Sequence, residues 1–83
     1  MNKISLNVHV PAVGRKHDFL VPEMMSISKI ISLMVNILSE EYPGIRIDSK
    51  QLSLMDMRSN KVMQQACTCK QLGVINGSKL MLL

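Results

Sequence analysis

The chain has 83 residues, which is enough for one small domain, residues 1–83, and leaves no room for a second. Apolar residues make up 47% of it, but the aromatic residues are only Phe19 and Tyr42, so we expect one aliphatic core. The formal net charge is +4, and the basic residues form no continuous run. Because few aromatic side chains can stack on bases, we expect no nucleic-acid binding.

Residues 1–22 predict a β-hairpin. Apolar and polar residues alternate over residues 4–10, which is the period of a strand with one buried face. Pro11 ends this strand, and residues 16–21 predict a second strand that directs Phe19 and Val21 toward the core.

A helix is predicted from Ile27 to near Glu41. Ser26 is a suitable N-cap, because its hydroxyl can accept a hydrogen bond from a free backbone N–H of the first turn. Apolar residues then recur at helical spacing until Pro43 and Gly44 prevent continuation. The apolar stripe covers about 200° of the helix, which is wider than one sheet face requires.

Two strands are predicted after the helix. Residues 51–57 form the longer one, with Leu52 and Leu54 on its inner face. After a turn, residues 61–63 form a short strand in which Met63 is the anchor in the core.

Residues 64–77 are predicted to connect to a last strand, residues 79–83, with Leu80 and Leu82 facing inward. The order of elements predicts an α+β fold, in which one helix crosses one face of a mixed four- to five-stranded sheet. The first and last strands can lie side by side and parallel, because a long crossover separates them.

A known family shares four features of this sequence. They are the segment Gly-Val-Ile-Asn-Gly at 73–77, Leu80 three residues later, an ending at Leu83 without a tail, and Ser26-Ile27 shortly after Val21. With this order of elements, the chain resembles the ubiquitin-like β-grasp proteins over essentially its whole length. Within that superfamily it resembles the YukD/EsaB family, which are small proteins of Gram-positive type VII (WXG100/ESX-type) secretion loci.

The resemblance implies a non-enzymatic accessory or regulatory protein of a type VII secretion system that acts by protein–protein contact. Because the chain ends at Leu83 without Gly-Gly, we expect that it is not conjugated. Three alternatives remain: an adaptor domain derived from a membrane component of the same apparatus, a modifier or sulfur carrier, and an RNA-binding β-grasp domain.

The sequence also predicts where the protein acts. Residues 1–10 contain no continuous apolar region of a signal peptide, and no apolar run approaches the ~20 residues that span a bilayer. We therefore expect a cytoplasmic protein with no membrane insertion and with reduced thiols. The identity of the protein partner and the oligomeric state are left open.

Two surfaces are candidates for partner binding. If the leucines of the last strands face the helix, then Met55, Met57, Met81 and Leu83 face away and form an apolar patch, unless a bulge shifts the parity. Leu33 and Ile37 at the helix margin are a second, weaker candidate surface. The preferred interpretation of this pair is that segment 42–50 or 64–72 covers it.

No catalytic, cofactor or metal site is predicted. Cys67 and Cys69 depart from the family pattern, but two thiols at this spacing need further ligands, and only His9 and His17 are available. Neither cysteine has an evident histidine base, and Glu40-Glu41 is a solvated helix end rather than a carboxylate pair. We therefore expect small, partly buried cysteines and no enzyme activity.

Overall fold

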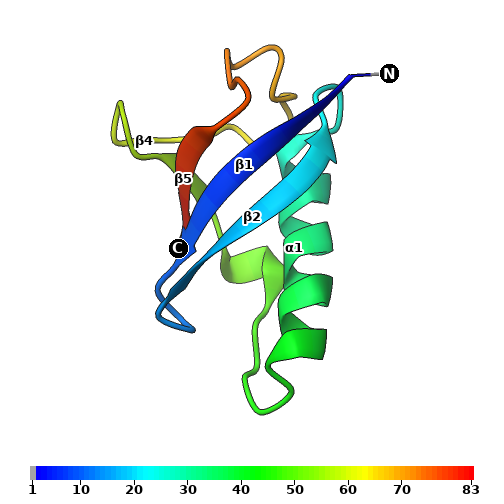
Figure 1. The fold of residues 1–83 in the computed structure, drawn as a ribbon, viewed down its shortest axis with the longest axis vertical. Helices are drawn as coiled ribbons and strands as arrows, with labels where there is room; N and C mark the ends of the chain where they lie inside the picture. Colours follow the sequence, from blue (N-terminus) through cyan, green and yellow to red (C-terminus); the bar gives the residue numbers. More distant parts are fainter. Residues whose placement is uncertain (1) are drawn as a thin grey trace.

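Residues 2–83 are described by a computed structural model. The elements in chain order are β1 (Lys3–Val10), β2 (Arg15–Pro22), α1 (Ile27–Glu41), the 3₁₀ turn η1 (Ser49–Gln51), β3 (Leu54–Asp56), β4 (Lys61–Val62) and β5 (Ser78–Leu82). The strands form one sheet in the order β2-β1-β5-β3-β4, and α1 lies across one face of it (Figure 1). β1 and β5 are parallel and the other pairs are antiparallel, which confirms the predicted mixed sheet.

The β1–β2 hairpin forms as its alternating pattern predicts. The register runs without interruption from Lys3 opposite Pro22 to Val10 opposite Arg15, so β2 is slightly longer than expected. Phe19 and Val21 are buried, as are the four alternating apolar residues of β1, whereas Arg15 at the start of the same face of β2 is exposed.

Helix α1 begins and ends where the capping signals predict. The Ser26 hydroxyl accepts from the Lys29 N–H at 3.3 Å, and the Tyr42 N–H donates to the Leu38 carbonyl at 2.8 Å. Within residues 2–83, no helix has the length and apolar character needed to cross a membrane. The helix packs on the sheet through six buried residues: Ile27, Ile30, Ile31, Met34, Val35 and Leu38.

Strand β3 is shorter than the predicted span of 51–57. The Asp48 carboxylate accepts from the Lys50 N–H at 3.0 Å and caps the 3₁₀ turn η1, so extended pairing cannot begin until after this turn. Leu52 was expected to be a strand residue, but it packs half-buried against the core from outside β3. Only Leu54 fills the inner position of the strand.

The segment that follows β4 is held in place by the buried Met63 and by hydrogen bonds to the start of α1. Met63 is buried, as predicted. The Cys67 carbonyl accepts from the Ile27 N–H at 2.8 Å, and the Gln65 carbonyl accepts from the Ser28 N–H at 3.0 Å. These bonds satisfy N–H groups of the first helical turn, which have no partner within the helix. The segment therefore runs past the start of α1.

The Asn76-Gly77 bend attaches the start of β5 to β1. The Asn76 side-chain oxygen accepts from the Ser5 N–H at 2.6 Å, and the Gly77 N–H donates to the Ser5 carbonyl at 2.7 Å. Gly77 has φ of +85°, a conformation that costs a residue with a Cβ about 1–2 kcal/mol. This bend sets the register of β5, and so decides which of its side chains face outward.

Candidate functional site

The face of the sheet opposite α1 carries the predicted methionines. Leu54, Leu80 and Leu82 are buried toward the helix, so the residues that alternate with them face outward. Met55 lies directly opposite Met81 in the β3–β5 register, and both are half-buried. The register contains no bulge over β3, so the alternation that the prediction required is present.

Val62 extends this apolar surface onto β4, and sequence reasoning missed it. Val62 lies opposite Met55 in the β3–β4 register and is 61% exposed. Paired residues of neighbouring strands share a face, so Met81, Met55 and Val62 form a row across three strands. The sequence could have indicated this position. Met63 was expected to point into the core, and successive side chains of a strand point to opposite faces, so Val62 should point outward.

Met57 and Leu83 complete the surface at its two ends. The Met57 N–H donates to the Lys79 carbonyl at 3.1 Å, and its side chain is 37% exposed. Leu83 exchanges two backbone hydrogen bonds with Ser53, at 2.8 and 2.9 Å, and is 48% exposed. We name this surface the methionine face, and its members are Met55, Met57, Val62, Met81 and Leu83.

The other half of the same sheet face is polar. Ser5, Asn7 and His9 occupy the outward positions of β1, and the Asn7 amide donates to the Asp18 carboxylate at 3.0 Å. His9 lies opposite Met81 in the β1–β5 register and marks the border. The exposed Leu20 is the apolar exception on β2.

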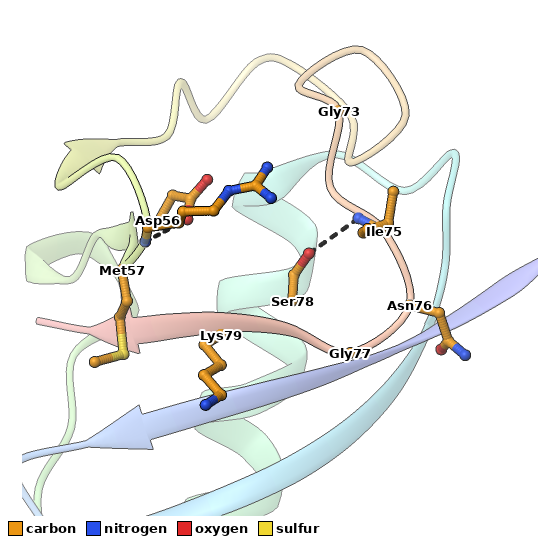
Figure 2. A pocket seen from close by; sticks show the side chains of 9 residues that line it. Asp56, Met57, Gly73, Ile75, Asn76, Gly77, Ser78 and Lys79 are labelled. Carbon is orange, nitrogen blue, oxygen red and sulfur yellow. Dashed lines mark hydrogen bonds between the residues drawn. The ribbon is translucent and has the colours of Figure 1, made fainter.

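A hollow of about 490 Å³ adjoins the methionine face (Figure 2). It lies between the end of β3 and the loop that leads into β5. Its lining includes Met57 and Ile75 as apolar side chains and Arg58 and Lys79 as cationic ones. The remaining lining residues are Asp56, Gly73, Asn76, Gly77 and Ser78.

Leu33 and Ile37 are each 39% exposed on α1. The preferred interpretation of the sequence, that segment 42–50 or 64–72 covers them, is therefore wrong. Segment 64–72 is hydrogen-bonded to the Ile27 and Ser28 N–H groups, in the first turn of α1, which precedes Leu33 and Ile37. Partner binding at this pair stays a prediction.

The two cysteines differ in environment. Cys69 is fully buried, and desolvation raises the pKa of its thiol. Cys67 is half-buried, and its Sγ donates to the Gln64 side chain at 3.4 Å. Both thiols are free, and over residues 2–83 no three or more potential ligands cluster in a way that could hold a metal ion.

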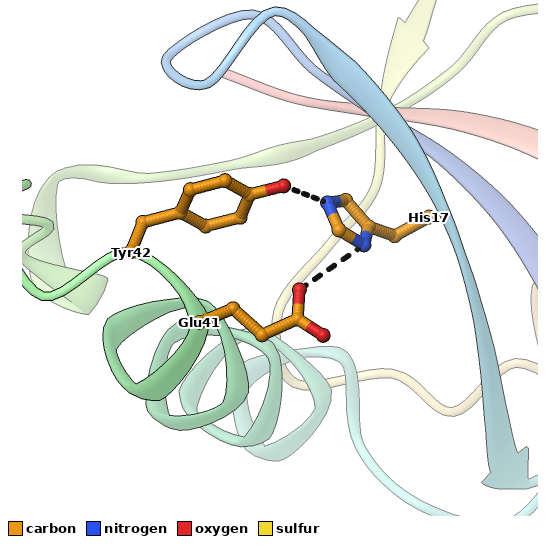
Figure 3. Close-up of polar contacts among 3 residues, drawn as sticks. All are labelled: His17, Glu41 and Tyr42. Carbon is orange, nitrogen blue, oxygen red and sulfur yellow. Dashed lines mark hydrogen bonds and ion pairs between the residues drawn. The ribbon is translucent and has the colours of Figure 1, made fainter.

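His17 connects the hairpin to the end of α1 (Figure 3). Its Nε2 lies 3.1 Å from the Tyr42 hydroxyl, and its Nδ1 lies 3.6 Å from a carboxylate oxygen of Glu41. The Tyr42 ring meets the imidazole edge-on, with the centroids 5.8 Å apart. His17 shares the strand parity of the buried Phe19, and both of its side-chain partners come from the end of α1. These contacts join β2 to the C-terminal end of α1.

No protein-family model and no curated protein matches the chain by sequence. Among solved structures, the ubiquitin-like domain of the type VII secretion system protein EccD1 from Mycobacterium tuberculosis is 18% identical, with a TM-score of 0.75 and coverage of 100% of this chain and 99% of that one. The EccD5 ubiquitin-like domain from Mycobacterium xenopi is 11% identical, with a TM-score of 0.79 and coverage of 100% and 94%.

Ubiquitin from Caldiarchaeum subterraneum is 12% identical, with a TM-score of 0.78 and coverage of 98% of this chain and 91% of that one. At these identities, the likeness establishes the fold. The chain has the ubiquitin-like β-grasp fold, as predicted. It is similar in structure to the ubiquitin-like domain of the type VII secretion system protein EccD1 and to that of EccD5.

Proposed function

We propose that residues 1–83 form a single ubiquitin-like protein-binding module that serves a type VII secretion system. Two lines of support agree. The sequence resembles the YukD/EsaB family of Gram-positive secretion loci, and the fold is similar to two EccD ubiquitin-like domains over essentially their full length. In this proposal the protein is a cytoplasmic accessory factor that acts by non-covalent contact and carries out no catalysis.

The methionine face is the observation that supports protein binding most strongly. It places five apolar side chains on one outward surface, of which Met57, Val62 and Leu83 are exposed and Met55 and Met81 are half-buried. Contiguous exposed apolar surface marks interaction sites, and methionine adapts to irregular partner surfaces at little cost. We therefore propose that Met55, Met57, Met81 and Leu83, together with Val62, contact the partner.

A second candidate is an adaptor domain of a larger secretion protein. The observation in its favour is that both mycobacterial matches are ubiquitin-like domains, and the first is a domain of a named secretion system protein. In this alternative the same face would contact another component of the apparatus. The module and its contact surface would be unchanged, and only the covalent context would differ.

Affinity capture from the native cell, read by mass spectrometry, tests this proposal. The baits are the wild type, a Met57→Asp/Leu83→Asp variant and a Leu33→Asp/Ile37→Asp variant as matched control. Both variants replace two exposed apolar residues by aspartate, so they are comparable in charge and in expected stability. Circular dichroism melts confirm that all three baits are folded.

We expect the wild type and the helix variant to recover identified type VII secretion components and the Met57/Leu83 variant to lose them. Loss with the Leu33/Ile37 variant alone would move the contact to α1 and contradict the assignment to the methionine face. If folded wild type recovers no secretion component, the proposed function is wrong.

A further inference from the structure

We infer that the hollow beside the methionine face binds an acidic peptide segment of the partner, with one apolar side chain of that segment inserted between Met57 and Ile75. The inference rests on the proposed function, because it names the chemistry of the partner at the same surface. Met57 belongs both to the methionine face and to the hollow. A bound segment would therefore continue directly from one into the other.

The two apolar side chains of the hollow are accessible from solvent. Met57 is 37% exposed and Ile75 is 62% exposed, and they lie on either side of Ser78 (Figure 2). The volume of about 490 Å³ falls within the range of about 300–1,000 Å³ of sites that bind small ligands. This is enough space for one large apolar side chain among the lining residues.

The charge of the hollow indicates which residues of the peptide would flank the inserted apolar side chain. Arg58 and Lys79 line it, and both are exposed. Asp56 is the one acidic residue of the lining, and its carboxylate accepts from the Arg58 N–H at 2.9 Å. Asp56 also lies opposite Lys61 in the β3–β4 register. The rim therefore carries an excess of positive charge that complements carboxylates on either side of the inserted residue.

The walls of the hollow are held by hydrogen bonds within the protein. On the loop side, the Ser78 hydroxyl accepts from the Ile75 N–H at 3.0 Å (Figure 2). On the β3 side, the Asp56 carbonyl accepts from the Asn60 N–H at 2.8 Å, and Met57 is bonded to Lys79. A preformed site loses little conformational entropy on binding, which favours a peptide that has to be ordered itself.

The lining favours a peptide over a nucleic acid. None of the nine residues that line the hollow is aromatic, so there is no platform on which a base could stack. The apolar surface of Met57 and Ile75 would have no role in binding a bare anion. A segment that contributes both carboxylates and one apolar side chain uses the whole lining.

The experiment is a titration of the isotopically labelled protein, followed by the backbone amide signals in ¹H–¹⁵N spectra. The probe is the peptide Gly-Asp-Glu-Asp-Leu-Asp-Glu-Asp-Gly, with a second peptide that has serine in place of leucine, and with inorganic phosphate. The protein variants are Arg58→Glu/Lys79→Glu and Ile75→Ser. Lys50→Glu/Lys70→Glu is the matched control, because it makes the same change of charge at exposed residues outside the hollow.

We expect saturable shifts at the amides of residues 56–58 and 73–79 with the leucine peptide. The Arg58/Lys79 variant should bind about tenfold more weakly, because two favourable charge contacts become repulsive. The Ile75 variant and the serine peptide should also bind more weakly, and the Lys50/Lys70 variant should bind as the wild type does.

Equal weakening by both charge variants would show that only net charge matters, and would overturn the inference. The same follows if phosphate alone produces the full shifts, or if the serine peptide binds equally well. Shifts confined to Met55, Met81 and their neighbours would retain the proposed binding face but reject the hollow. The titration can therefore reject peptide binding in the hollow while the capture experiment still supports the proposed function.

Discussion

The two halves of the outer sheet face differ, although the same helix covers their inner sides. On β1 the outward residues are Ser5, Asn7 and His9, whereas the β5–β3–β4 half carries the methionine face. The buried inward residues of both halves are apolar, whereas Arg15, Asp56 and Lys61 on the same side are polar and not buried. The core therefore accounts for the buried inner residues, but it does not account for the apolar outer pattern of one half.

An apolar residue that packing does not require suggests a role in contact with another molecule. Inner and outer residues can be compared most directly where they are neighbours in one strand and face opposite ways, as Leu80 and Met81 do on β5. Leu80 is fully buried and Met81 is half-buried. Substitutions at such neighbours separate stability from binding.

Leu80→Ala should destabilise the fold by about 2–5 kcal/mol, because it removes buried methyl groups and leaves a cavity under α1. Met81→Ala should cost about 1 kcal/mol or less, since its side chain already contacts solvent. Urea unfolding of both variants beside the wild type measures the difference. Equal losses would show that Met81 belongs to the core and would remove it from the binding surface.

Gly77→Ala tests the bend that joins the two halves. The positive φ of Gly77 makes a Cβ unfavourable by about 1–2 kcal/mol, although no atom lies within 4 Å of its position. The control is Gly44→Ala, where φ is not positive and the space is also open, and we expect a change near zero or a gain of about 0.4–1 kcal/mol. Thermal unfolding distinguishes the two, and an unchanged Gly77→Ala protein would contradict the assigned conformation.

The raised pKa of Cys69 predicts a loss of stability in alkaline solution. Burial keeps the folded thiol protonated above its ordinary pKa of 9.0, whereas the unfolded thiol ionises there. The contribution is complete below that pH and decreases as the pH rises through the folded pKa. Between pH 8 and 10, stability should fall more steeply in the wild type than in Cys69→Ala. Parallel pH profiles would show that the thiol ionises equally in both states.

Single substitutions at the exposed outer face should change stability least. Met57→Ser and Leu20→Ser, one in each half, should each stay within about 0.5 kcal/mol of the wild type in urea unfolding, because both side chains are exposed. Only Met57→Ser should weaken partner recovery. A stability loss above 1 kcal/mol for Met57→Ser would indicate packing rather than contact.

The spacing of apolar residues was sufficient to predict the helix and the strands that bury one face in the core. The alternation of β1, the helical spacing after Ser26 and the leucines of β5 predicted the α+β fold, the helix boundaries and the burial of Leu80 and Leu82. These predictions succeeded because burial of one face dominates the energetics of each element.

The remaining features depend on contacts that periodicity does not contain. The Asp48 cap shortened β3, segment 64–72 is hydrogen-bonded to the first turn of α1, and Leu33 and Ile37 are exposed. The hollow forms where residues distant in sequence, such as Met57 and Ile75, line one space. Neither their proximity nor the pairing of Val62 with Met55 follows from local spacing.

Site-specific photo-crosslinking in the native cell compares the two halves directly. p-Benzoylphenylalanine replaces Met57 in one protein and Leu20 in another, because both positions are exposed and on the outer face. We expect position 57 to form a covalent adduct with an identified type VII secretion component and position 20 to form none with it. An adduct from position 20 alone, or none from either protein, would contradict the binding role of the methionine face.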